Sequence, residues 1–86
     1  MTSLREKFGN RIRSIRSSRK KSQEEFAELL DISVDFLSLI ERGINAPSFE
    51  NLEVFSTRLG IPVSELFAFD IDSVPGESRQ VPPQIR

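Results

Sequence analysis

Apolar residues recur along the first 69 positions at intervals of three and four, which is the spacing of one face of an α-helix. The first such series is Leu4, Phe8, Ile12 and Ile15. These side chains are predicted to form the buried stripe of an N-terminal helix, with the intervening arginines on its other faces. The polar run from residue 17 to residue 21 marks the end of this helix.

Serine residues mark the starts of the next helices. Ser22 and Glu25 have the spacing of a capping box, in which the hydroxyl and the carboxylate bond to free backbone amides of the first helical turn. This predicts a second helix to about residue 30. After the short connection 31–33, Ser33 is predicted to cap a third helix that ends near Gly43.

The remaining pattern predicts two more helices and a tail. Ser48 and Gly60 are predicted to cap the two ends of a fourth helix, and Pro62 is expected to open a short fifth helix over residues 63–69. The inward-facing residues predicted for the third and fourth helices are Leu37, Ile40, Leu52, Phe55 and Leu59. Residues 70–86 contain several Pro and few apolar residues, which predicts a flexible tail. The expected fold is all-α, a compact five-helix domain over residues 1–69.

Composition excludes much of enzyme chemistry. The 86 residues include no Cys and no His, which removes thiol nucleophiles, disulfides, the usual zinc ligands and the commonest proton-transfer group. With no Gly-rich phosphate loop, the sequence predicts a protein that is not an enzyme and uses neither a metal nor a cofactor. No apolar run approaches the roughly 20 residues that span a bilayer. No association with a membrane is expected, and a cytoplasmic location is predicted.

The charge is unevenly distributed. The net charge is −1, yet residues 1–21 hold eight basic residues and one acidic residue, while the rest of the chain is acidic. A local basic patch can meet phosphates even on an acidic molecule. A solvated helix face would have the same composition, so the charge alone leaves nucleic-acid binding open.

A set of spaced motifs narrows the interpretation. The stretch Ser22-Gln23-Glu24-Glu25-Phe26-Ala27, followed by Ile40-Glu41-Arg42-Gly43 and Pro47, resembles the signature of the Xre and lambda-repressor-like helix-turn-helix family over roughly residues 8–67. The resemblance implies that the third helix, residues 33–42, enters the major groove of double-stranded DNA. It also implies dimers that bind half-sites about one DNA turn apart. Asp31 stands where the family turn usually has Gly, and Asp tolerates the left-handed conformation better than most residues.

The resemblance also implies individual roles. Gln23 matches a family position that hydrogen-bonds a DNA phosphate, and a merely polar surface role is the alternative. The candidates for phosphate contact are Ser22, Gln23, Arg42 and Asn45. Arg16 and Glu41 match a family ion pair that ties the first helix to the end of the third, and this pair is predicted to be structural.

The predicted base-reading surface departs from the familiar members. The positions that match their base contacts are Val34, Asp35 and Leu39. Asp can accept from a cytosine amino group, and Val or Leu can touch a thymine methyl. Alternatively, Asp35 stabilises its own helix dipole, and the two apolar residues add packing. The full set of base-readout candidates is Ser33, Val34, Asp35, Phe36, Ser38 and Leu39.

Two functional hypotheses remain open at this point. Leu66, Phe67 and Phe69 cannot all face one small core, and they are candidates for a dimer interface. The leading hypothesis is a homodimeric regulator that binds a near-palindromic operator. The alternative is a protein-interaction module on the same fold, such as an antitoxin or a regulator subunit, which would bind another protein through the third helix or these C-terminal side chains.

Overall fold

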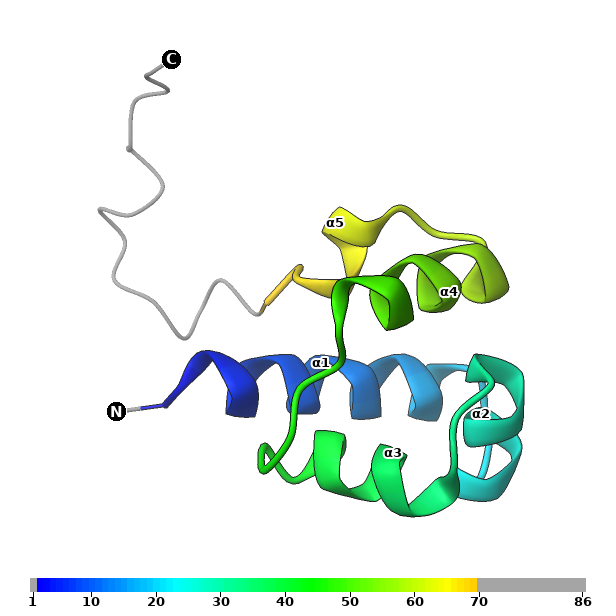
Figure 1. The fold of residues 1–86 in the computed structure, drawn as a ribbon, viewed down its shortest axis with the longest axis horizontal. Coiled ribbons are helices and arrows are strands. Elements are labelled where there is room, and N and C mark those ends of the chain that lie inside the picture. Colours follow the sequence, from blue (N-terminus) through cyan, green and yellow to red (C-terminus); the bar gives the residue numbers. More distant parts are fainter. Residues whose placement is uncertain (1, 70–86) are drawn as a thin grey trace.

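The computed structural model describes residues 2–69, which form five α-helices and no strand (Figure 1). The helices are α1 (Leu4–Ser18), α2 (Gln23–Leu30), α3 (Val34–Glu41), α4 (Phe49–Leu59) and α5 (Val63–Leu66). In Figure 1, α1 lies between α3 on one side and α4 with α5 on the other, and α2 closes one end. The all-α class is confirmed, and the predicted tail, residues 70–86, lies outside the described residues. No helix within residues 2–69 is both long and apolar enough to cross a membrane.

Serine hydroxyls begin four of these helices. Ser3, Ser22, Ser33 and Ser48 have extended backbones, and each hydroxyl accepts the N–H of the third residue of its helix. In α1, α2 and α4 the side chain of that third residue bonds back to the serine N–H and completes a capping box. The predicted caps at residues 22, 33 and 48 are confirmed, whereas the cap at Ser3 was not predicted.

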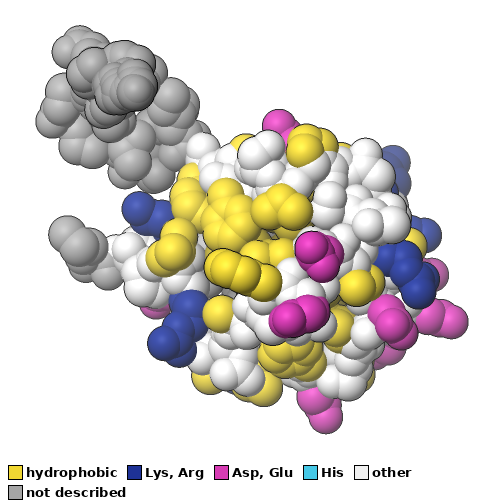
Figure 2. All heavy atoms as spheres, turned by 45° about the horizontal axis from the view of Figure 1, so that its top comes forward, with side chains coloured by type: hydrophobic (Ala, Val, Ile, Leu, Met, Phe, Trp, Pro, Cys, Tyr) yellow, Lys and Arg dark blue, Asp and Glu magenta, His cyan; other side chains and the backbone are white. Residues whose placement is uncertain are grey.

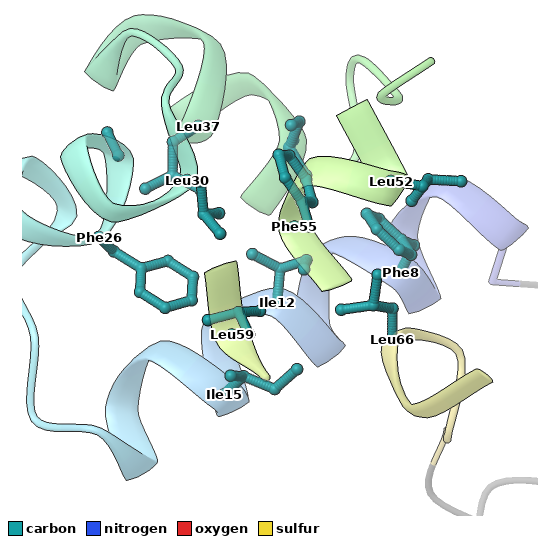
Figure 3. Close-up of a cluster of buried hydrophobic side chains, with 12 residues drawn as sticks. Phe8, Ile12, Ile15, Phe26, Leu30, Leu37, Leu52, Phe55, Leu59 and Leu66 are labelled. Carbon is teal, nitrogen blue, oxygen red and sulfur yellow. The ribbon is translucent and has the colours of Figure 1, made fainter. Parts of the chain in front are cut away.

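One face of each helix contributes to the apolar core (Figure 3). The buried apolar residues are Phe8, Ile12, Ile15, Phe26, Ala27, Leu30, Leu37, Ile40, Leu52, Phe55, Leu59 and Leu66. Leu4 was predicted to join this core, but it is 61% exposed. Leu4 is the first residue of α1. The apolar face of α1 therefore begins before the point where another helix packs against it.

The connections between helices are tight. Asp31 ends α2 in the left-handed conformation (φ +63°, ψ +42°), and the N–H of Ile32 donates to the carbonyl oxygen of Ala27 at 3.0 Å. The three-residue turn expected from the sequence is therefore present. Gly60 ends α4 with φ +71°, as predicted. The expectation for α5 was too long, because this helix stops at Leu66 after a single turn.

Gly9 allows α1 and α3 to cross closely. A Cβ atom at this position would overlap the carbonyl oxygen of Ile40 and lie 2.9 Å from that of Glu41. Gly in a helix interior costs about 1 kcal/mol relative to Ala. The close backbone contact, which no larger residue permits, offsets this cost.

Replacing Gly9 by Ala is expected to destabilise the domain. The gain in helix propensity is smaller than the cost of pushing α3 away, so the free energy of unfolding should fall by about 1–3 kcal/mol. Urea denaturation followed by circular dichroism measures this change. Ser14→Ala, at an exposed position of the same helix, is the control and should be neutral or slightly stabilising. Equal stability of the two variants would show that the crossing has room for a methyl group.

Candidate nucleic-acid interface

One face of α3 forms a continuous strip that is open to solvent at least in part. Asp35, Ser38, Leu39 and Arg42 follow the i, i+3, i+4, i+7 spacing of a single helix face. Asp35 and Arg42 are exposed, while Ser38 and Leu39 are half-buried. The opposite face of α3 lies in the core. The strip therefore presents two charged and two uncharged side chains on a helix whose position is fixed from behind.

The other predicted base contacts lie on the borders of this strip. Val34 and Phe36 are half-buried and pack against the apolar core. The hydroxyl of Ser33 accepts the N–H of Phe36 at 3.0 Å and caps the helix. Among the six predicted base-readout residues, Asp35, Ser38 and Leu39 thus belong to the strip, whereas Val34 and Phe36 pack against the core and Ser33 caps the helix.

Glu41 joins three elements behind the strip. Its side chain is 1% exposed, and Arg16 on α1 binds it in a bidentate manner, with Nε 2.7 Å from Oε2 and Nη2 3.1 Å from Oε1. The Gln23 side chain donates from Nε2 to Oε1 at 2.9 Å. Arg16 also donates from Nη1 to the carbonyl oxygen of Lys21 at 3.1 Å. The predicted pair of Arg16 and Glu41 is confirmed, and it extends to the start of α2.

This network keeps Glu41 ionised. Burial of the carboxylate raises its pKa, but the hydrogen bonds from Arg16 and Gln23, together with the charges of Arg16 and Arg13, bring the pKa of Glu41 below its ordinary value. A buried, ionised carboxylate with these partners links the helices that contact it, which is a structural role.

The predicted phosphate contacts lie around the junction of α2 and α3. Gln23 has given one amide N–H to Glu41, and its carboxamide retains a second N–H. Ser22 is exposed, and its hydroxyl accepts the N–H of Glu25 at 3.0 Å, so its own proton remains to be donated. Arg42 and Asn45 are both exposed just beyond α3. The bond between Gln23 and Glu41 brings the start of α2 beside the end of α3.

The arginines of the basic N-terminal segment contact different parts of the fold. Arg11 donates from Nε to the carbonyl oxygen of Glu65 at 2.8 Å, and its Nη2 lies 3.3 Å from Glu65 Oε1. Arg19 donates to the carbonyl oxygen of Leu59 at 2.8 Å. These two arginines tie α1 and the residue that follows it to the α4–α5 side of the molecule. Arg13, by contrast, faces Glu41 with Nε 3.7 Å from Oε1.

Arg13 and Gly9 were missed by the sequence reasoning. Arg13 lies three residues before Arg16, and Gly9 lies seven before it. The same helical spacing that placed the apolar stripe would have put all three on one side of α1. The predicted pair of Arg16 and Glu41 already placed this side of α1 beside the end of α3, whereas the burial of Glu41 is seen only in the tertiary structure.

Comparison with known proteins identifies the family. A family model described as "Helix-turn-helix" matches residues 12–66. The chain belongs to this helix-turn-helix family. The resemblance to Xre-type proteins that the sequence motifs indicated is thereby confirmed, and the helix-turn-helix itself consists of α2, the turn 31–33 and α3.

Several similar proteins are regulators by name. The control protein C.MunI of Mycoplasma sp is 39% identical over 69 residues, which cover 79% of this chain and 93% of that protein. The restriction-modification controller protein C.AhdI of Aeromonas hydrophila is 34% identical, with a TM-score of 0.67 over 72% of this chain and 90% of its own. The clp gene regulator ClgR of C. glutamicum is 33% identical, with a TM-score of 0.70 over 77% and 85% of the two chains.

The lowered pKa of Glu41 predicts a loss of stability in acid. A carboxylate whose pKa is lower in the folded state stabilises the fold above its ordinary pKa of about 4.3, and this contribution disappears as the pH falls through the folded-state pKa. The free energy of unfolding should therefore decrease as the pH falls below about 5. Glu41→Gln should be about 3 kcal/mol less stable at pH 7, because it leaves Arg16 without its charged partner, and should lose less in acid.

Urea denaturation at a series of pH values measures this dependence. Glu53→Gln, which changes an exposed carboxylate on α4, is the matched control and should lose stability in acid as the wild type does. Parallel acid profiles for Glu41→Gln and the wild type would contradict the role assigned to this carboxylate.

Proposed function

We propose that this helix-turn-helix protein is a transcriptional regulator that binds double-stranded DNA in a sequence-specific manner, with α3 in the major groove. The observation that carries the proposal is the strip of Asp35, Ser38, Leu39 and Arg42, with both of its ends exposed, on a helix whose opposite face is held in the core. A helix with its side chains is about 10–12 Å across, which fits a major groove about 12 Å wide. The relatives named as control proteins and gene regulators support the regulatory function.

Each residue of the strip has a chemical role in this proposal. Asp35 accepts a hydrogen bond from a cytosine amino group, and Leu39 contacts a thymine methyl. The Ser38 hydroxyl donates to or accepts from a base edge. Val34 and Phe36 line the borders of the strip with their exposed portions, and Ser33 remains the cap of α3. Because a carboxylate is repelled by the negative field of the groove, Asp35 raises specificity at some cost in affinity.

The phosphate contacts in the proposal surround the strip. Ser22 and Gln23 donate to the backbone of one strand from the first turn of α2, where the helix dipole also favours an anion. Arg42 and Asn45 contact the backbone from the far end of α3. Contacts to phosphates set the orientation of the protein on the duplex, whereas the strip supplies the sequence information.

We also propose that the protein acts as a homodimer on a near-palindromic operator. Val63 and Phe67 are 39% and 37% exposed on the α5 side of the molecule, where apolar side chains gather on the surface (Figure 2). The Phe67 ring lies 5.0 Å from that of Phe8 and 6.1 Å from that of Phe69, measured between centroids. Leu66, an interface candidate from the sequence, is withdrawn because it is fully buried and has no surface for a partner.

Selection of duplexes from a randomised DNA pool at about 0.1 M salt tests the proposed function, because phosphate contacts alone enrich no sequence. A two-fold symmetric motif is the expected result. A folded protein that enriches no sequence would contradict the proposal and favour the alternative of a protein-interaction module.

Single substitutions are expected to separate the two kinds of contact. Gln23→Ala should weaken binding to all duplexes to a similar degree, whereas Asp35→Ala should relax the preference at one base pair by about 1–3 kcal/mol. Fluorescence anisotropy with the selected duplex and single-base variants measures both effects. Thr57→Ala, exposed on α4, is the control, and thermal unfolding of each variant shows whether the fold is retained. If Asp35→Ala leaves the base preference unchanged, Asp35 does not take part in the readout.

The dimer is expected to depend on the exposed aromatic surface. Phe67→Ser should raise the dimer dissociation constant at least tenfold, because aromatic side chains at the centre of an interface carry much of the binding energy. Sedimentation equilibrium over a concentration series measures this. Ile44→Ser, which removes an exposed apolar side chain from the loop that follows α3, is the control and should leave the dimer unchanged. A wild-type protein that stays monomeric at tens of micromolar would contradict the homodimer.

A further inference from the structure

A polar groove of about 390 Å³ opens between the first half of α1 and the end of α3. Its lining residues are Thr2, Glu6, Asn10, Arg13, Glu41 and Arg42. We propose that this groove holds a phosphate of the DNA backbone, bound by the guanidinium groups of Arg13 and Arg42 with the Asn10 carboxamide as a further donor. The inference rests on the proposed DNA-binding function and extends the protein's contact with DNA from the helix-turn-helix to α1.

Arg13 supplies a positive charge in addition to the groups that hydrogen-bond Glu41 directly. Glu41 already receives a bidentate contact from Arg16 at 2.7 and 3.1 Å and a hydrogen bond from Gln23 at 2.9 Å. Arg13 lies 3.7 Å from the same carboxylate, beyond hydrogen-bond distance, and its side chain is 52% exposed. Its donors therefore remain available to an anion in the groove.

The remaining charges at the groove are favourable to an anion. Glu41 is neutralised by Arg16, which leaves the two guanidinium groups of Arg13 and Arg42 opposite one other carboxylate, Glu6. Glu6 accepts the N–H of Ser3 at 2.9 Å in the capping box of α1. The groove thus keeps a net positive charge, and planar guanidinium groups match the geometry of phosphate oxygens.

The groove is continuous with the proposed DNA surface. Arg42 belongs to both the strip on α3 and the lining of the groove. A helix in the major groove is flanked by the sugar-phosphate backbones, so a strand that passes the end of α3 is brought toward α1. Gly9 makes this possible because it lets α1 approach the carbonyl groups at the end of α3.

Arg13→Gln in the 86-residue chain, assayed with the selected duplex, tests the inference. Loss of one phosphate contact should reduce the magnitude of the slope of log K against log salt by about 0.9. Affinity at 0.1 M salt should fall about tenfold for all sequences, with the selected motif unchanged. Arg13→Lys should retain much of the affinity because it keeps the charge, and it separates a binding effect from a folding effect.

Arg11→Gln is the matched control. It removes the same charge from the same helix, but Arg11 contacts Glu65 on α5 and does not line the groove. Its effect on the salt slope should be small. If Arg13→Gln and Arg11→Gln lower the affinity and the slope equally, the arginines act only through the general charge of α1, and the inference is overturned.

Glu6→Gln provides a test with the opposite sign. Gln preserves the capping box and removes the one unpaired negative charge from the groove, so DNA should bind several-fold more tightly. Glu53→Gln, on a helix that does not line the groove, should change affinity less. Unchanged affinity in Glu6→Gln would overturn the inference.

The proposed function and the groove fail in different ways. Wild-type protein that binds no duplex would reject both. A second outcome would reject the groove alone. In it, the wild type binds a selected duplex and Gln23→Ala weakens this binding, which supports the proposed function, but Arg13→Gln and Arg11→Gln have equal effects.

Discussion

The structure depends on the burial of one carboxylate. Glu41 is the charged residue that residues 2–69 enclose almost completely, and an unpaired charge in that position would cost several kcal/mol. Arg16 and Gln23 remove this penalty only if α1, α2 and α3 all keep their places. The same bonds that satisfy the carboxylate therefore fix the orientation of α3 relative to the start of α2, which are the two parts that the proposed function places on DNA.

Backbone packing makes this arrangement possible. Gly9 lowers the helix propensity of α1, but it allows a crossing at which α1 contacts the carbonyl groups of Ile40 and Glu41. The crossing brings Arg16 within bidentate distance of the carboxylate, and it leaves Arg13 beside it as an additional cation. A structural ion pair and a surplus positive charge thus have one geometric origin.

The tertiary structure also resolves the contrast between an acidic chain and a proposed nucleic-acid partner. Arg11 and Arg19 donate hydrogen bonds to carbonyl groups at the α4–α5 side of the molecule. The basic N-terminal segment is therefore not one uniform patch. Arg13 and Arg42 lie instead where α1 meets the end of α3. The local distribution of cations, more than the net charge, decides which face is suited to phosphate.

The sequence by itself determined the five helices, the caps at Ser22, Ser33 and Ser48, the left-handed turn at Asp31 and, through resemblance, the partner of Glu41. These features depend on periodicity, short-range hydrogen bonds and a motif with fixed spacing, all of which are visible along one chain. Only the tertiary structure decided that Leu4 is exposed and that Leu66 is buried. It alone also showed that Glu41 is enclosed almost completely and that Arg13 lies 3.7 Å from its carboxylate. Burial and charge pairing depend on which helix covers a given face, and local spacing carries no information about that partner.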